Sequence, residues 1–205
     1  FYAVSAGAMD SMINHYTANR KRRNADAYSP GGAIERRPDR ANAVYAQRCR
    51  EAFKGIPVIA GGVEASLRRV SHYDYWSDKV WPSSLVTSKA DLVAYGNGEA
   101  SILEIAMRLR DGESIRDLRD MRGVAYLLGK NDSLPEHRFH DDEGDEQTLT
   151  LPSHEEVIES GEKFARATRI LHRETNPLNA RRLVQANGDR QVVINPPPLP
   201  LTEKT

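Results

Sequence analysis

The sequence of 205 residues contains a single cysteine, Cys49, and no apolar run long enough to cross a bilayer. One thiol excludes an internal disulfide, and this chain alone cannot supply the thiolates of a four-thiolate zinc site or an iron–sulfur cluster. The start at Phe1 lacks the basic, apolar and small-residue zones of a secretion signal. We therefore expect a cytoplasmic protein that does not bind a membrane.

An excess of charge is also absent, because 29 Lys and Arg residues balance 29 Asp and Glu residues. The chain as a whole therefore does not attract nucleic acid, and binding would need a local patch. Two basic runs, Arg20 to Arg23 and Arg68-Arg69, offer one. A basic run at a helix end is more typical of a solvated surface than of a phosphate grip. We do not expect nucleic-acid binding, which stays an alternative.

Short β-rich runs alternate with segments of helical periodicity, which predicts an α/β fold. The expected strands are residues 1–6, 56–60, 92–95, 124–128 and 191–194. Helical patterns cover residues 10–23, 38–54, 99–111 and 153–171. This alternation predicts a parallel, Rossmann-like sheet with right-handed crossovers.

We divide the chain into three parts. Residues 1–129 form the Rossmann-like domain, which we expect to be truncated because the sequence opens directly in a strand-like run. Residues 130–150 are a polar insertion, and residues 151–205 hold a helix, a strand and a proline-rich linker. Within the first part, the loop from Ala25 to Arg37 is predicted to be mobile.

Glycine follows three of the predicted strands, in Ser5-Ala6-Gly7, Gly61-Gly62 and Gly96-Asn97-Gly98-Glu99. The carboxyl ends of parallel strands meet at one sheet edge, where α/β proteins bind ligands, and glycine lets a ligand approach the backbone. Each glycine alone is explained as well by a tight turn. Three together favour a binding edge. The sequence has neither Gly-x4-Gly-Lys-Ser/Thr nor a complete Gly-x-Gly-x2-Gly, which disfavours a simple NTPase or dehydrogenase.

Two further groups of residues carry weaker signals. The segment Ser71 to Asp78 combines aromatic rings with His72 and Asp74, and either lines a pocket or packs a loop against the sheet. The pair His137 and His140 matches no closed set of metal ligands, so we expect no metal there.

Several stretches of this sequence resemble YgiQ-family radical SAM proteins. They are Ser5 to Ala18, Tyr28 to Gly32, Arg37 to Arg40, Gln47 to Ala52, GGVEASLRRVSHYDYWSDKV from Gly61 to Val80, SKADLVAYGNGE from Ser88 to Glu99 and NPPPLPLT from Asn195 to Thr202. That family is similar to the wider group in which a cobalamin-binding-like Rossmann domain precedes a radical SAM barrel. The resemblance implies a cofactor crevice, and the residues we predict to border it are Ser5, Gly7, Gly61, Gly62, Glu64, Gly96, Asn97, Gly98 and Glu99.

The resemblance also implies what the rest of the protein does. A radical SAM barrel of the same polypeptide would be the partner of this chain and would hold a [4Fe–4S] cluster and S-adenosylmethionine. The Cys-x3-Cys-x2-Cys motif of that cluster is absent here, as is the cobalamin-ligating Asp-x-His-x2-Gly motif. The substrate and cobalamin binding therefore stay open. The alternative is a Rossmann-like module without catalysis that binds a nucleotide or another anion at a helix N-terminus.

Overall fold

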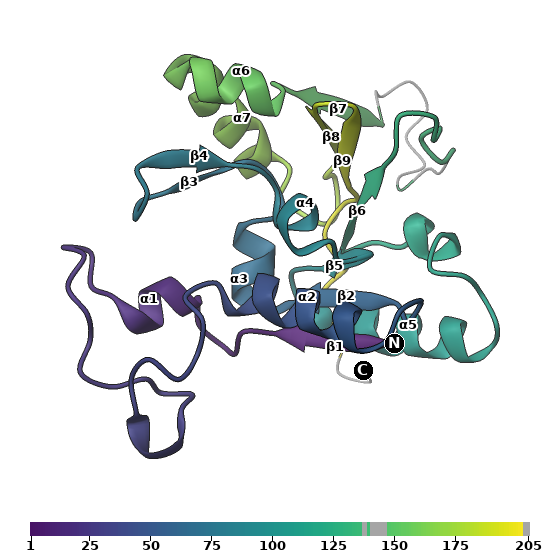
Figure 1. Ribbon diagram of the computed structural model, residues 1–205. Helices are drawn as coiled ribbons and strands as arrows, with labels where there is room; N and C mark the ends of the chain where they lie inside the picture. The colour runs from purple at the N-terminus through teal and green to yellow at the C-terminus, as the bar shows by residue number, and fades with distance from the viewer. Residues whose placement is uncertain (137–138, 140–146, 203–205) are drawn as a thin grey trace.

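The computed structural model describes residues 1–136, 139 and 147–202. Seven strands form one sheet in the order β1-β2-β5-β6-β9-β8-β7, and β3 and β4 form a separate hairpin (Figure 1). The strands are β1 Tyr2–Ser5, β2 Val58–Gly61, β3 His72–Asp74, β4 Lys79–Trp81, β5 Leu92–Ala94, β6 Val124–Leu128, β7 Thr148–Leu151, β8 Arg182–Asn187 and β9 Arg190–Ile194. The helices are α1 Ser11–His15, α2 Ala41–Ala52, α3 Gly62–Leu67, α4 Ser84–Ser88, α5 Gly98–Arg110, α6 His154–Glu159 and α7 Gly161–Arg173.

The strands β1, β2 and β5 are parallel neighbours, as the alternation of strands and helices predicts. Val4 pairs with Ala60, and Ala60 pairs with Val93. Helix α2 connects β1 to β2 across one face of the sheet and packs on both strands. This Rossmann-like part confirms the predicted α/β fold, and it brings three strand ends to the same edge.

The expectation that β6 continues the parallel arrangement is wrong, because β6 is antiparallel to β5. After α5, a 3-10 turn at Asp117–Asp120 carries the chain back across the sheet face. Leu118 and Met121 of this return are buried, and Gly123 O accepts a hydrogen bond of 2.8 Å from Tyr95 N. The chain thus re-enters the sheet beside the end of β5 rather than its beginning. Strands β9 and β8 continue the antiparallel pattern, and β7 is parallel to β8.

Two of the predicted helices are shorter than the sequence pattern indicates. Helix α1 ends at His15, because Tyr16 and Arg22 form an isolated antiparallel bridge that turns the following chain back. The predicted helix at residues 153–171 is two helices, separated at Ser160 with φ −137° and ψ 115°. Ser160 Oγ accepts from Lys163 N, so this residue caps α7. The capping box of Ser153 and Glu156 is present as predicted.

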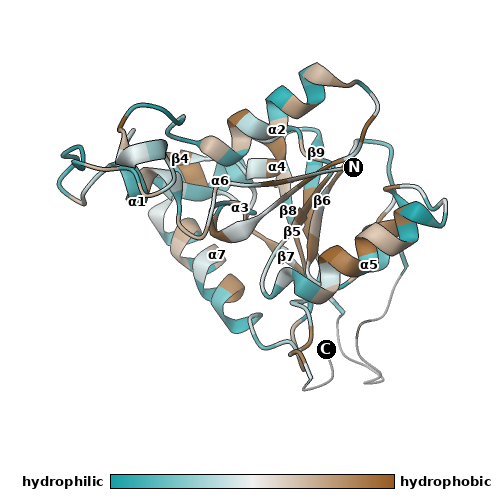
Figure 2. Cartoon of the chain, turned by 90° about the horizontal axis from the view of Figure 1, so that it is seen from below, coloured by the Kyte–Doolittle hydropathy of each residue, from teal (hydrophilic) through white to brown (hydrophobic). Residues whose placement is uncertain are grey.

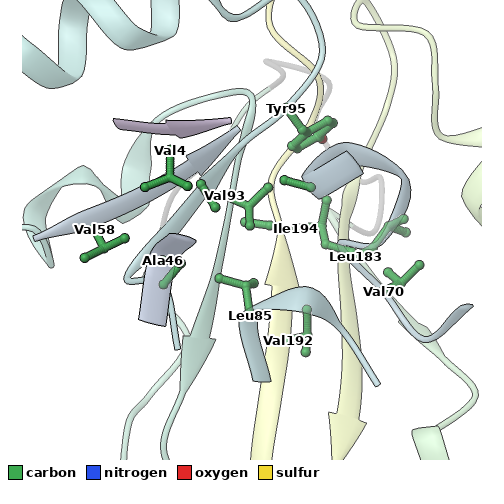
Figure 3. Close-up of a cluster of buried hydrophobic side chains, with 14 of the residues drawn as sticks. Val4, Ala46, Val58, Val70, Leu85, Val93, Tyr95, Leu183, Val192 and Ile194 are labelled. Atoms are coloured by element: carbon green, nitrogen blue, oxygen red, sulfur yellow. The ribbon is translucent and has the colours of Figure 1, made fainter. Parts of the chain in front are cut away.

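Alternate strand residues face the two sides of the sheet. On one side, α2, α3 and α4 cover a cluster that includes Val4, Val58 and Leu85 (Figure 3). On the other side, Ile105 of α5 packs with Ile59 and the chain that returns to β6. Figure 2 shows α2 and α4 on one side of the strands and α5 on the other. Neither α5 nor the chain returning to β6 buries Ala3 and Ser5 of β1, which are exposed.

The proline-rich tail is extended, as expected, and lies against the sheet end. Gly123 N donates to Pro196 O over 2.8 Å, and Tyr95 Oη donates to Asn195 O. The ring of Pro198 lies 3.0 Å from the position that a Cβ of Gly96 would occupy. The first proline residues after β9 are therefore part of the packed domain.

Candidate functional site

A groove of about 400 Å³ opens where β1, β2 and β5 end. Six of the nine residues predicted to border a cofactor crevice line it: Ser5, Gly61, Gly62, Gly96, Gly98 and Glu99. Its floor and wall are apolar and consist of Ala3, Val4, Ile59, Ala94 and Ile102. The arrangement joins an apolar surface to glycine backbone and one carboxylate, which suits an organic ligand laid across the strand ends.

The glycines of the groove differ in what they require. Gly62 has φ +77°, and a Cβ placed on it would lie 2.5 Å from Ser5 Oγ. Both the backbone conformation and the neighbouring side chain therefore demand glycine there. Gly98, the first residue of α5, has no positive φ, and no atom lies within 4 Å of the position of its Cβ. Its glycine leaves open space in the groove rather than relieving strain.

Polar groups enter the groove from β1 and α5. Ser5 Oγ accepts a hydrogen bond of 3.1 Å from Gly7 N, which turns the chain away from the strand end. Glu99 lies in the first turn of α5, where its negative charge complements the helix dipole. Asn97 is the N-cap of α5, but its side chain makes no capping hydrogen bond. The first amides of α5 therefore have no side-chain acceptor at the cap position.

Three predicted residues do not line the groove. Asn97 is exposed at the cap of α5. Gly7 has φ +107° and lies under the Tyr28 ring, whose Cζ is 2.8 Å from the position of a Cβ.

Glu64 is the third, and it is buried on the α2 side of the sheet, 2% exposed. Its carboxylate accepts from Ser11 N at 2.9 Å and from Asn42 N at 3.0 Å, and it lies 3.4 Å from Arg68 Nη1. Glu64 thereby satisfies a backbone amide at the start of α2.

A buried polar network, which the sequence pattern did not indicate, organises the chain beyond β1. Asp26 is 1% exposed and accepts from Arg37 Nε at 2.8 Å and from Arg37 Nη2 at 3.1 Å. Arg37 holds the pKa of the Asp26 carboxyl well below its usual range, although burial acts in the opposite direction. His15 Nε2 lies 3.3 Å from Asp26, and His15 Nδ1 lies 3.0 Å from Asp39. The loop from Ala25 to Arg37 is irregular, but this network ties it to α1.

The aromatic segment from Ser71 to Asp78 forms the β3–β4 hairpin, which projects beside α1 (Figure 1). The Trp76 ring packs against Tyr16 at 4.1 Å between centroids. Asp74 forms an ion pair with Arg40 and caps the hairpin turn through Trp76 N at 3.0 Å. These contacts fit the loop-packing interpretation, while His72 lines a separate cavity.

The basic runs are largely engaged within the chain. Arg23 Nε donates to Ile13 O at 2.8 Å, and Arg22 pairs with Glu35. Arg68 pairs with Asp10 at 2.7 Å, while the Arg69 guanidinium lies over the Tyr95 ring at 4.6 Å. These contacts favour structural roles over a phosphate-binding patch.

The chain does not fit an iron–sulfur cluster. Cys49 is the one cysteine of the sequence, and it packs against the core from α2. A cluster of this kind needs three thiolates. The described residues contain no group of three or more His, Cys, Asp or Glu side chains arranged to hold a metal. His137 and His140 lie outside the described residues.

No helix in the described part of the chain is long and apolar enough to span a membrane.

Comparison with known proteins identifies relatives along the whole sequence. A UPF0313 protein of Rhodopseudomonas palustris is 54% identical over 211 residues, covering 98% of this chain and 31% of that protein. The UPF0313 protein of Geobacter sulfurreducens is 48% identical, covering 99% of this chain and 32% of that protein. The UPF0313 protein YgiQ of Escherichia coli is 44% identical, with coverages of 98% and 33%. No solved structure matches the chain.

The chain spans about a third of the length of these relatives. A family model described as Radical SAM N-terminal matches residues 1–205. This match and the YgiQ relative confirm the resemblance found in the sequence. The chain belongs to the Radical SAM N-terminal family.

Proposed function

We propose that this chain is the accessory N-terminal region of a radical SAM enzyme. The family match over residues 1–205 carries the proposal. The relatives are about three times longer, so the remaining two thirds of such a polypeptide have room for a catalytic barrel. That part would supply the [4Fe–4S] cluster and the S-adenosylmethionine site, since this chain offers one cysteine.

Within that enzyme, the groove at the ends of β1, β2 and β5 is the proposed contact site for a substrate or second cofactor. Its position at the carboxyl ends of parallel strands is the usual ligand site of α/β sheets. Ile59 and Ile102 give it an apolar surface, and Gly98 leaves it open. In this role the chain would bind and orient a ligand while the barrel performs the chemistry.

The alternative of an anion-binding module has one observation in its favour, the absence of a side-chain cap on the amides of α5. Glu99 opposes it, because this carboxylate lines the same groove and repels a phosphate. The groove therefore favours a neutral or cationic group beside α5.

The test is to reconstitute the full-length protein with iron and sulfide under anaerobic conditions and measure cleavage of S-adenosylmethionine to 5′-deoxyadenosine. We expect cleavage that depends on the cluster. A full-length protein that takes up no cluster, yet binds nucleoside phosphates in the groove, would support the alternative. Glu99→Gln distinguishes the two, because removing the carboxylate should strengthen the binding of an anion.

A further inference from the structure

Strand β1 is an outer strand of the sheet (Figure 1). Within the described residues its one neighbour is β2. Tyr2 N donates to Pro57 O at 2.8 Å, so Tyr2 turns its backbone groups toward β2. Successive residues of a strand alternate in this respect. Val4 therefore also faces β2, and the N–H and C=O groups of Ala3 and Ser5 face the outer side of the sheet.

The outer side of β1 lacks the features that keep a sheet edge from pairing. Edge strands usually carry charged side chains or proline, or are distorted by a bulge. The sequence of β1 is Tyr-Ala-Val-Ser, without a charge or a proline. Its pairing with β2 runs without interruption from Tyr2 to Ser5, so no bulge distorts it. Such an edge is a template for a further strand.

One face of the sheet is also uncovered at β1. Parallel strands normally have both faces covered. Helix α2 packs on one face of β1, but Ala3 and Ser5 are exposed on the other. On that side, Ile102 of α5 lines the same groove as Ala3, and Leu103 and Met107 of α5 are 59% and 46% exposed. An element placed there would bury apolar surface of both β1 and α5.

The rest of the same polypeptide fits this position better than a second copy of the chain. The relatives are about three times longer than the chain, so a protein of that length has two thirds of its residues outside this region. A tethered segment competes at an effective concentration on the order of millimolar. Pairing of two copies through the four residues of β1 is small beside the roughly 1,200 Å² that stable complexes bury.

We propose that a segment of the full-length polypeptide outside residues 1–205 adds a strand to the free edge of β1 and covers Ala3. The sheet then continues on both sides of β1. The added segment also forms one wall of the groove, because Ala3 and Ser5 border it. The inference requires a longer polypeptide but not the proposed catalytic role, and its tests do not depend on an iron–sulfur cluster.

Amide hydrogen exchange of the full-length protein tests the free edge, with single residues resolved by electron-transfer fragmentation. Tyr2 and Val4 are the internal reference, because their amides face β2. We expect the amides of Ala3 and Ser5 to exchange at least about a hundredfold more slowly than in an unstructured peptide. Exchange of these two amides at the unstructured rate overturns the proposal.

The substitution Phe1→p-benzoylphenylalanine identifies the element beside β1. Phe1 is 44% exposed next to the first residue of the strand, and the photoreactive analogue keeps its ring. An equal mixture of isotopically light and heavy full-length protein is irradiated and digested. We expect a crosslink to a peptide outside residues 1–205 that carries the same isotope. A crosslink between a light and a heavy chain identifies a second copy and overturns the proposal, as does the absence of any crosslink outside residues 1–205.

A matched pair of lysine variants tests whether Ala3 is covered in the full-length protein. Ala3→Lys places an ammonium on the bare face of β1, and Ala165→Lys places one on the outer face of α7, where Glu162 and Arg169 are exposed. We expect Ala3→Lys to lower the melting temperature by about 5 °C or more, because a covered charge loses its hydration. Ala165→Lys should melt within about 1 °C of the wild type. Equal melting of the two variants overturns the covering of Ala3.

Discussion

The substitution Gly98→Val tests whether the groove contacts a ligand or whether its glycines only allow the chain to turn. Gly98 has an ordinary helical start and open space around its missing Cβ, so valine should change the free energy of unfolding by less than about 0.5 kcal/mol. Gly112 has φ +96° and also lies in open space. Valine there should cost about 2 kcal/mol from backbone strain alone, which lowers the melting temperature by about 4 to 8 °C.

Gly62→Val combines backbone strain with a steric clash, so we expect the largest loss of folding stability among the three glycine variants. Its φ of +77° strains the backbone, and the 2.5 Å approach to Ser5 Oγ forces the neighbouring strand to move. Strain and overpacking together should cost about 3 kcal/mol or more. The variant that damages folding most is therefore not the cleanest test of ligand binding.

The assay is turnover of the full-length enzyme, corrected for folded protein, beside thermal melting of each variant. We expect Gly98→Val to melt like the wild type and to lose activity at least tenfold, because the side chain occupies the groove. Gly112→Val should melt lower and keep its activity per folded molecule. If Gly98→Val retains full activity, or if activity follows stability in all three variants, the groove does not contact the ligand.

Three predictions concern the fold. Asp26→Asn should destabilise the chain by about 3 kcal/mol in denaturant melts, because it leaves Arg37 buried without its carboxylate. As a control, Asp111→Asn removes the carboxylate of the exposed pair with Arg110 and should cost less than about 0.5 kcal/mol. The pKa of the Asp26 carboxyl is lowered on folding, so its contribution to the free energy of unfolding should be complete above about pH 5 and be lost as the pH falls through the pKa of the folded state. In acid, the stability of the Asp26→Asn variant should therefore depend less steeply on pH than that of the wild type. Ser153→Ala should cost about 1 kcal/mol by removing the α6 cap, and no change in melting would contradict the capping box.

The parallel half of the sheet could be predicted from sequence because its signals are local. Val58 to Ala60 and Leu92 to Ala94 are uninterrupted apolar runs that end at or near glycine, which is the pattern of a buried parallel strand. The edge at which their glycines meet follows from strand direction alone. Six predicted residues consequently line one groove.

In the other half, β6 and β9 were predicted as strands but β7 and β8 were not, and β8 buries polar residues. Arg182 and Gln185 of β8 are 3% and 2% exposed, and distant groups satisfy them. Arg182 donates to Pro135 O at 2.7 Å, and Gln185 accepts from Ser71 N at 2.9 Å. Partners so far away in the sequence leave no periodicity near β8 itself. The reversal that makes β6 antiparallel likewise depends on the packing of Leu118 and Met121.

The network around Asp26 was missed for a similar reason. A loop with many polar residues and Ser29-Pro30-Gly31-Gly32 is typical of a mobile surface segment. The side chains of His15, Asn14 and Arg37 converge on Asp26 only when the loop folds back over α1. Glu64 shows the same limit, since its motif position suggested a ligand contact and its carboxylate binds the start of α2.

Whether the cluster belongs to the rest of the polypeptide is tested most directly by the iron and acid-labile sulfide content of two proteins after anaerobic reconstitution. Residues 1–205 and the full-length polypeptide should be reconstituted in the same way. Iron, acid-labile sulfide and charge-transfer absorbance are then measured for both. We expect one [4Fe–4S] cluster for each full-length chain and none for residues 1–205, whose single thiol is Cys49. A stoichiometric cluster on residues 1–205, or none on the full-length protein, would contradict it.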